Sequence, residues 1–217
     1  MMSLHHFSKE HLKITDGQTR AGLKITFIGL FVNVILVVLK LIVGIVGRSR
    51  ALIADGVHSF ADFLTDVITS LGIYLGNIPA DECHHYGHKK IETVSEAIMG
   101  AVLICVGGGL SFDAGRAIYY NDLTMPHGIT ILVALASFMV KEILYHATIK
   151  VGRQAGSNVI IANAWHHRSD ALSSLAVLIG LLVVYFVPSV KFIDTLLGFV
   201  VGALIIGIGW RLAWDAL

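Results

Sequence analysis

Long apolar segments separated by short polar ones make up most of the chain. A helix needs roughly 20 mostly apolar residues to cross the hydrocarbon core of a bilayer, and six segments provide them. These are Leu23 to Val46, Ala51 to Ile78, Glu92 to Ala114, Ile129 to Thr148, Ile160 to Val187, and Phe192 to Trp214. The pattern therefore predicts an all-α protein, a bundle of six transmembrane helices.

The overall composition agrees with a membrane protein. Hydrophobic residues make up 55% of the 217 residues, charged residues make up 14%, and the mean hydropathy is +0.76, far from the balance of a soluble domain. The expected partner is therefore the lipid bilayer. A formal net charge of +1 without a basic run argues against a nucleic-acid partner. Two cysteines, far apart in the chain, are too few for a disulfide framework.

Polar residues divide the chain into an arm and one membrane domain. The first twenty residues lack the apolar core and the cleavage site of a signal peptide, so we expect residues 1–20 to remain as an N-terminal arm. Residues 21–217 are expected to form a six-helix transmembrane domain. Its longer polar links are "PADECHHYGHKK" and "YYNDLTMPHG".

The basic residues predict the orientation of the bundle. An even number of spans places both termini on one side of the membrane. Lys9, Lys13, Arg20, Lys24, Lys89, Lys90, Lys150, Arg153 and Arg211 fall on that side, against Arg48, Arg50, Arg116 and Lys191 on the other. The positive-inside rule then predicts that both termini are cytoplasmic. Lys40 and Lys141 lie within spans, about two turns from a helix end, and we expect their side chains to snorkel to the interface.

One face of the second span carries several ionisable groups. Asp55, Ser59, Asp62 and Asp66 follow one another at spacings of four, three and four residues, which places them on one side of a helix. His58 precedes Asp62 by four residues, so these two side chains are also neighbours. Asp66 lies one turn nearer the predicted cytoplasmic end and is a candidate carboxylate on an entry path.

The fifth span repeats this arrangement. In "NAWHHRSDALSS", His166 precedes Asp170 by four residues. A lone His or Asp in a span often serves as a polar contact between helices. Charges inside a bilayer cost about 2.5 to 3.5 kcal/mol or more each and tend to mark ion pathways, so two matched pairs favour a functional site.

The two pairs together offer nitrogen and oxygen ligands to a divalent cation. The second and fifth spans run in opposite directions, so we expect His58 near the depth of Asp170 and Asp62 near that of His166. Four such ligands suit a tetrahedral cation, with zinc the first candidate. His167 is rotated away from this face and is expected to pack or to support the site.

A second cluster lies in the link after the second span. It contains Asp81, Cys83, His84, His85 and His88. A solvated polar loop would explain this composition, and so would a second metal site, because three histidines beside a carboxylate are common zinc ligands.

Three segments in this order resemble the cation diffusion facilitator family of divalent metal/proton antiporters. They are "SRALIADGVHSFADFLTD", "PADECHHYGHKKIE" and "NAWHHRSDALSSLAVLIG". The resemblance implies a transport site and a peripheral cytoplasmic metal site. The first comprises His58, Asp62, His166 and Asp170, and the second Asp81, His84 and His88. Histidine at position 58, where other members have aspartate, is similar to the zinc-preferring group.

The resemblance also carries expectations about assembly and location. It implies a homodimer in the cell membrane, the inner membrane of a prokaryote. Most members continue after the sixth span into a cytoplasmic ferredoxin-like domain of roughly a hundred residues. This chain is expected to lack that domain, since it stops just past the sixth span.

The expected function is zinc efflux in exchange for protons. Metal ligation needs neutral imidazole and ionised carboxylate, so Zn²⁺ and H⁺ compete for the same side chains. The protein is then a transporter and not an enzyme. An exporter of ferrous iron or manganese is the alternative within the family. More distant alternatives are an intramembrane metallohydrolase, for which the sequence has no HExxH motif, and a haem carrier in which His58 and His166 face one another.

Overall fold

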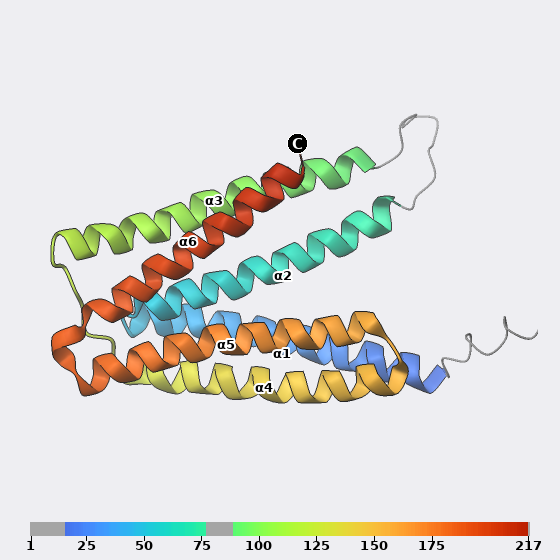
Figure 1. The fold of residues 1–217 in the computed structure, drawn as a ribbon, viewed down its shortest axis with the longest axis horizontal. Helices are drawn as coiled ribbons and strands as arrows, with labels where there is room; N and C mark the ends of the chain where they lie inside the picture. Colours follow the sequence, from blue (N-terminus) through green and yellow to red (C-terminus); the bar gives the residue numbers. More distant parts are fainter. Residues whose placement is uncertain (1–15, 77–88, 217) are drawn as a thin grey trace, which may run out of the picture.

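The computed structural model describes residues 16–76 and 89–216, and this part of the chain consists of six long helices with short connections (Figure 1). They are α1 (Asp16–Val46), α2 (Arg50–Gly76), α3 (Lys89–Tyr119), α4 (Ile129–Ala155), α5 (Asn158–Phe186) and α6 (Phe192–Asp215), with a short 3-10 helix, η1 (Pro188–Val190), before α6. The prediction of an all-α six-helix membrane bundle is confirmed.

Five of the helices are long and apolar enough to cross a membrane. They supply the segments 21–46, 96–119, 129–155 and 158–186, and, with η1, the segment 188–214. The remaining helix, α2, is similarly long but holds three aspartates between Asp55 and Asp66. It packs against α1, α3 and α6, and we treat it as the sixth spanning helix. The protein is thus a multi-pass membrane protein, and the cytoplasmic side of its termini stays a prediction.

Several helices extend beyond the apolar segments that predicted them. α1 begins at Asp16, within the expected arm of residues 1–20. α3 continues to Tyr119 and α4 to Ala155, where the sequence includes Arg116 and Arg153. Apolar length marks the part of a helix that crosses lipid. Hydrogen bonding continues the helix into polar surroundings until a cap such as Gly156, with φ of 61°, ends α4.

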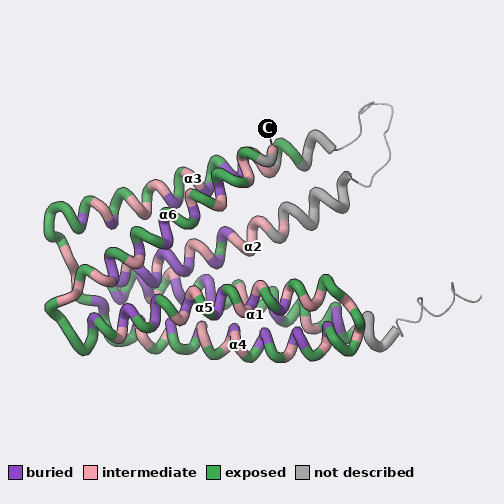
Figure 2. Tube along the Cα trace, viewed as in Figure 1, coloured by how far each residue is buried: buried purple, intermediate pink, exposed green. Residues whose placement is uncertain are grey.

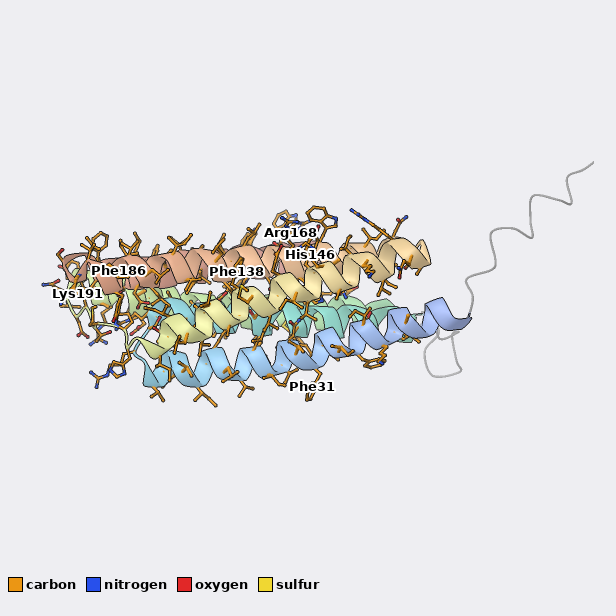
Figure 3. The ribbon with its side chains drawn as sticks, turned by 90° about the horizontal axis from the view of Figure 1, so that it is seen from below. Phe31, Phe138, His146, Arg168, Phe186 and Lys191 are labelled. Carbon is orange, nitrogen blue, oxygen red and sulfur yellow. The ribbon has the colours of Figure 1, made fainter. Side chains whose placement is uncertain are left out.

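The helices form two groups. α1, α4 and α5 lie together, and α2 lies with α3 and α6; Figure 1 shows the second group rising away from the first towards the end at which α1 begins. Figure 2 shows that exposed residues cover the outer faces of both groups. Many of these residues are large and apolar, such as Phe31 and Phe186, which project outward in Figure 3. These outer faces suit contact with lipid.

Helix α2 contributes to two separate hydrophobic cores. Ala51 and Leu52 belong to a buried cluster with residues of α4 and α5. Ala54 and Ala61 belong to another, formed with residues of α3 and α6. α2 therefore packs against both groups, and its polar face lies at their boundary.

Glycines bring α3 and α6 into close contact. A Cβ atom at Gly107 would lie 2.7 Å from the carbonyl oxygen of Gly202, and one at Gly100 would lie 2.6 Å from that of Gly209. Small residues let helix backbones approach closely in a membrane, where apolar burial alone does not drive helices together. The α3–α6 contact thus requires glycine at these positions.

We predict that Gly107→Ala destabilises the protein by about 1 to 3 kcal/mol, because α3 and α6 must separate to make room for the methyl group. Gly108→Ala is the matched control, since nothing lies within 4 Å of a Cβ at Gly108, and it should be neutral or stabilising by up to about 1 kcal/mol. Thermal unfolding in detergent measures both variants. Equal stability of the two would contradict the packing described for Gly107.

Candidate metal centre

The polar faces of α2 and α5 bring three of the predicted transport-site residues together. Asp62, His166 and Asp170 each offer one ligand atom, and these atoms all lie within 4.8 Å of one another. Asp62 of α2 and His166 of α5 are therefore close, as the opposite directions of the two helices predict. One imidazole and two carboxylates at this spacing can hold a divalent cation.

His58 lies beside this group and not within it. Its Nε2 is 3.5 Å from Asp62 Oδ2, while His166 Nε2 is 3.7 Å from Asp170 Oδ2. The Nδ1 atom of His58 is buried and has no hydrogen-bond partner in the described part of the chain. A buried polar atom of this kind costs free energy until something binds it, so His58 is available as a further ligand.

The side chains of the group are partly exposed. The side chains of His58 and Asp62 are 19% and 17% exposed, and that of His166 is 33% exposed, whereas that of Asp170 is only 6% exposed. The candidate site thus has an accessible side, formed by Asp62 and the histidines, and a buried side at Asp170.

The predicted snorkelling of Lys40 and Lys141 is wrong. Both side chains are buried, at 0% and 1% exposure, and each meets an aspartate of a neighbouring helix. Lys141 Nζ donates a hydrogen bond to Asp170 Oδ2, and Lys40 Nζ lies 2.8 Å from Asp55 Oδ2. An ion pair within reach compensates a charge without extending the side chain to the interface.

The Lys40–Asp55 pair joins three helices. Lys40 Nζ also donates to Ser59 Oγ of α2 at 3.1 Å and to Ser174 Oγ of α5 at 2.9 Å, which accounts for all three of its donors. Ser173 and Ser174 each donate to a different oxygen of Asp55, both at 3.1 Å. Asp55 therefore serves as a structural contact here, although its position in the polar series also suits a metal ligand.

Asp194 is an important buried residue that the sequence analysis missed. It lies in the first turn of α6 and accepts hydrogen bonds from Ser49 Oγ at 2.6 Å, from Arg50 N at 2.8 Å and from Ala51 N at 3.3 Å. A carboxylate at a helix N-terminus satisfies free N–H groups and favours the helix dipole. The signal available in the sequence is one acidic residue at the start of an otherwise apolar span.

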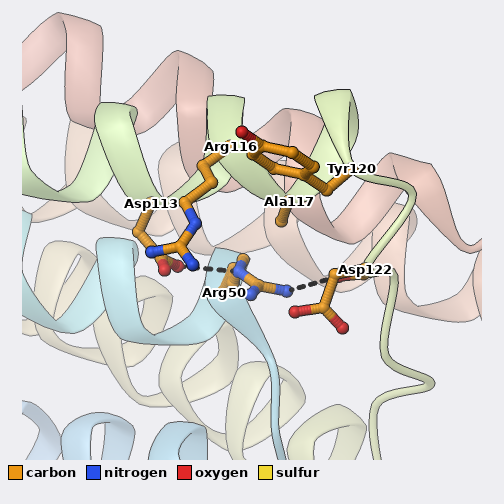
Figure 4. Close-up of a pocket in the computed structure, with 6 residues that line it drawn as sticks. All are labelled: Arg50, Asp113, Arg116, Ala117, Tyr120 and Asp122. Atoms are coloured by element: carbon orange, nitrogen blue, oxygen red, sulfur yellow. Dashed lines mark hydrogen bonds and ion pairs between the residues drawn. The ribbon is translucent and has the colours of Figure 1, made fainter.

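A pocket at the same end of the bundle is held by an ion pair. It has a volume of about 250 Å³ and is lined by Arg50, Asp113, Arg116, Ala117, Tyr120 and Asp122 (Figure 4). Arg50 Nε lies 2.8 Å from Asp113 Oδ2. The arginine is thus paired across α2 and α3, and the pocket is separate from the group on α2 and α5.

His167, which is expected to pack or to support the site, lies against α1. It is buried and packs near Gly29 of α1, where a Cβ atom would lie 3.0 Å from the His167 Nε2 atom. The predicted peripheral residues Asp81, His84 and His88 lie outside the described residues. Binding of metal by either set of residues stays a prediction.

The family of the chain follows from comparison with known proteins. Residues 26–217 match the cation efflux transmembrane domain. The chain belongs to this family. Its resemblance to the cation diffusion facilitators is thereby confirmed. The family is one of membrane transporters and not of enzymes, which confirms the expectation that this protein is not an enzyme.

Similar proteins come from archaea, bacteria and plants. The chain is 36% identical over 173 residues to an uncharacterized transporter of Methanocaldococcus jannaschii, covering 80% of this chain and 60% of the relative. It is 38% identical over 159 residues to the manganese efflux system protein MneP of Bacillus subtilis, covering 73% and 53%. Metal tolerance protein C1 of Arabidopsis thaliana is 36% identical over 205 residues, covering 88% and 43%. The chain thus spans about half the length of these relatives.

We predict that Lys40→Met lowers the free energy of unfolding by about 3 to 5 kcal/mol, because it leaves the buried Asp55 carboxylate without its cation. Adding Asp55→Asn should restore most of the loss, since the amide oxygen can accept from one serine and the amide nitrogen can donate to the other. Unfolding of Lys40→Met, of Asp55→Asn and of the double variant in detergent measures the coupling. A double variant whose loss equals the sum of the two single losses would contradict the pairing.

Proposed function

We propose that this chain forms the transport domain of a divalent-metal efflux protein. The observation that carries the proposal is the convergence of ligand atoms from Asp62, His166 and Asp170 within 4.8 Å of one another on two spanning helices. Ionisable groups inside a membrane are costly and mark ion pathways. A site between helices that belong to different groups also suits alternating access, in which one group moves against the other.

Zinc is the substrate that we propose first. Imidazole nitrogen and carboxylate oxygen are both good zinc ligands, and zinc accepts a mixed set of four. Asp62, His166 and Asp170 would supply three of them. His58, 3.5 Å from Asp62 and with a free buried nitrogen, would supply the fourth after a small rotation of its ring.

Proton exchange follows from the chemistry of these ligands. A protonated imidazole or carboxylate binds metal poorly, so protons and metal exclude one another at the site. Metal would load on the side with the lower proton concentration and leave on the more acidic side. We therefore propose metal/proton antiport, with H⁺ as the counter-ion.

Manganese is the second candidate substrate. The relative from Bacillus subtilis is named as a manganese efflux protein. Two of the three gathered ligands are carboxylates, which suit manganese, whereas imidazole suits zinc. The two histidines decide our preference for zinc, and a direct comparison of the two ions tests it.

Further proposals rest on the sequence and the family resemblance. We propose a peripheral cytoplasmic metal site at Asp81, His84 and His88, assembly as a homodimer, and a location in the cell membrane with both termini in the cytoplasm. A loop site outside the membrane path would bind metal without carrying it.

We predict that Asp62→Ala lowers metal transport into proteoliposomes by at least about 100-fold, because it removes one of the gathered ligands from the path. Glu142→Gln is the control, since this carboxylate pairs with His146 on α4 and should leave transport near the wild-type rate. Uptake is measured separately with zinc and with manganese. Wild-type uptake by folded Asp62→Ala would refute the site, and faster uptake of manganese than of zinc would reverse the order of substrates.

We also predict that an imposed pH gradient controls the direction of transport. Metal uptake into vesicles with an acidic lumen should be faster than uptake without a gradient, and protons should leave the lumen as metal enters. A pH-sensitive dye inside the vesicles records the proton movement. Metal uptake that does not respond to the gradient would rule out antiport while leaving metal transport itself in place.

A further inference from the structure

Lys141 is hydrogen-bonded to a carboxylate of the candidate metal centre. Asp170 belongs to the group whose ligand atoms lie together, and its Oδ2 atom accepts a hydrogen bond from Lys141 Nζ. The same oxygen lies 3.7 Å from His166 Nε2. The ammonium of α4 is therefore bound where a metal ion shared by Asp170 and His166 would bind.

We propose that Lys141 is a tethered cation that holds Asp170 while the site is empty and leaves it when a divalent metal ion binds. The proposal rests on the function proposed above and adds a residue that sets the affinity of the site. The step is an exchange of one cation for another at Asp170. The returning ammonium then helps to expel the metal.

Electrostatic repulsion is the physical basis of this exchange. A divalent ion on Asp170 would lie within a few ångströms of the ammonium, and like charges at that distance repel strongly where water is scarce. Lys141 is 1% exposed, so water does not screen this repulsion. Each binding event must therefore move the lysine, and the cost of moving it weakens metal binding.

A hydrogen-bond acceptor for the displaced ammonium lies on the same helix, α4. Ser137 precedes Lys141 by four residues and lies on the same face of α4. Its side chain is fully buried, and its hydroxyl oxygen has no hydrogen-bond partner within the described residues. Helical side chains point towards the N-terminal end of their helix, so the flexible stem of Lys141 can carry its ammonium from Asp170 to Ser137.

Lys40 shows the contrasting arrangement. It is equally buried, but Asp55, Ser59 and Ser174 bind all three of its donors. Its carboxylate partner lies outside the group of three metal ligands. Lys40 is thus a fixed contact, and it provides a matched control for removal of a buried lysine.

The test is equilibrium binding of zinc and of manganese to purified wild type, to Lys141→Met and to the double variant of Lys40→Met with Asp55→Asn. Binding is measured at one pH by calorimetry in detergent. Lys141→Met should bind metal about tenfold more tightly or better, because the competing cation is gone. The double variant should stay within about threefold of wild type, because it removes a buried cation together with its anion and avoids the unpaired Asp55 charge of Lys40→Met alone. In proteoliposomes Lys141→Met should have a lower KM and a lower maximal rate, since the metal leaves more slowly.

A second variant keeps the proposal testable if Lys141→Met fails to fold. Ser137→Ala removes the waiting acceptor with little change in volume, and it should weaken metal binding about threefold. Folded Lys141→Met that binds metal as wild type does or more weakly would overturn the proposal, as would unchanged affinity in Ser137→Ala. Metal binding that is absent from wild type, or is unaffected by Asp170→Asn, would instead overturn the proposed function together with this inference.

Discussion

A charge among membrane-spanning helices must be compensated by another helix, and this requirement governs how the bundle is assembled. Asp55 of α2 is paired with Lys40 of α1, Asp170 of α5 with Lys141 of α4, and Asp194 of α6 with the N-terminus of α2. Lipid gives helices little hydrophobic reason to associate. Polar contacts therefore fix which helices are neighbours, and small or apolar side chains fill the space between them.

Helix α2 shows why the candidate metal centre lies where it does. Its apolar positions are divided between one core with α4 and α5 and another with α3 and α6. The remaining face carries Asp55, Ser59 and Asp62 towards α5. Around Asp55 this face is covered by Lys40 and by the serines that bind them. Asp62, His58 and His166 instead keep part of their surface exposed.

The sequence predicts the bundle and most of the candidate site, because both depend on regular spacing. Apolar length reveals the spans, and a separation of four residues places His58 beside Asp62 and His166 beside Asp170. The partners of Lys40 and Lys141 cannot be predicted from this spacing. A lysine near a helix end can reach the interface or a carboxylate, and the choice depends on which helix lies next to it, which periodicity within one helix does not encode.

Helix ends and Asp194 were missed for a related reason. The apolar part of the sequence shows which part of a helix crosses the lipid. The helical hydrogen bonding of α1, α3 and α4 continues beyond that part into polar residues. Asp194 binds residues 49 to 51, and a contact between positions so far apart in the chain leaves no local pattern.

The glycine contacts and the Asp194 cap together have a mechanical consequence. Three hydrogen bonds attach the start of α2 to α6, and backbone contact without intervening side chains attaches α6 to α3. These three helices are thereby coupled, so a displacement of α2 along its axis carries α3 and α6 with it. The hydrogen bonds from Ser173 and Ser174 to Asp55 also attach the first half of α2 to α5, so a movement of α2 against α5 would pivot there. The carboxylates and imidazoles of the candidate centre lie beyond this pivot, on both helices.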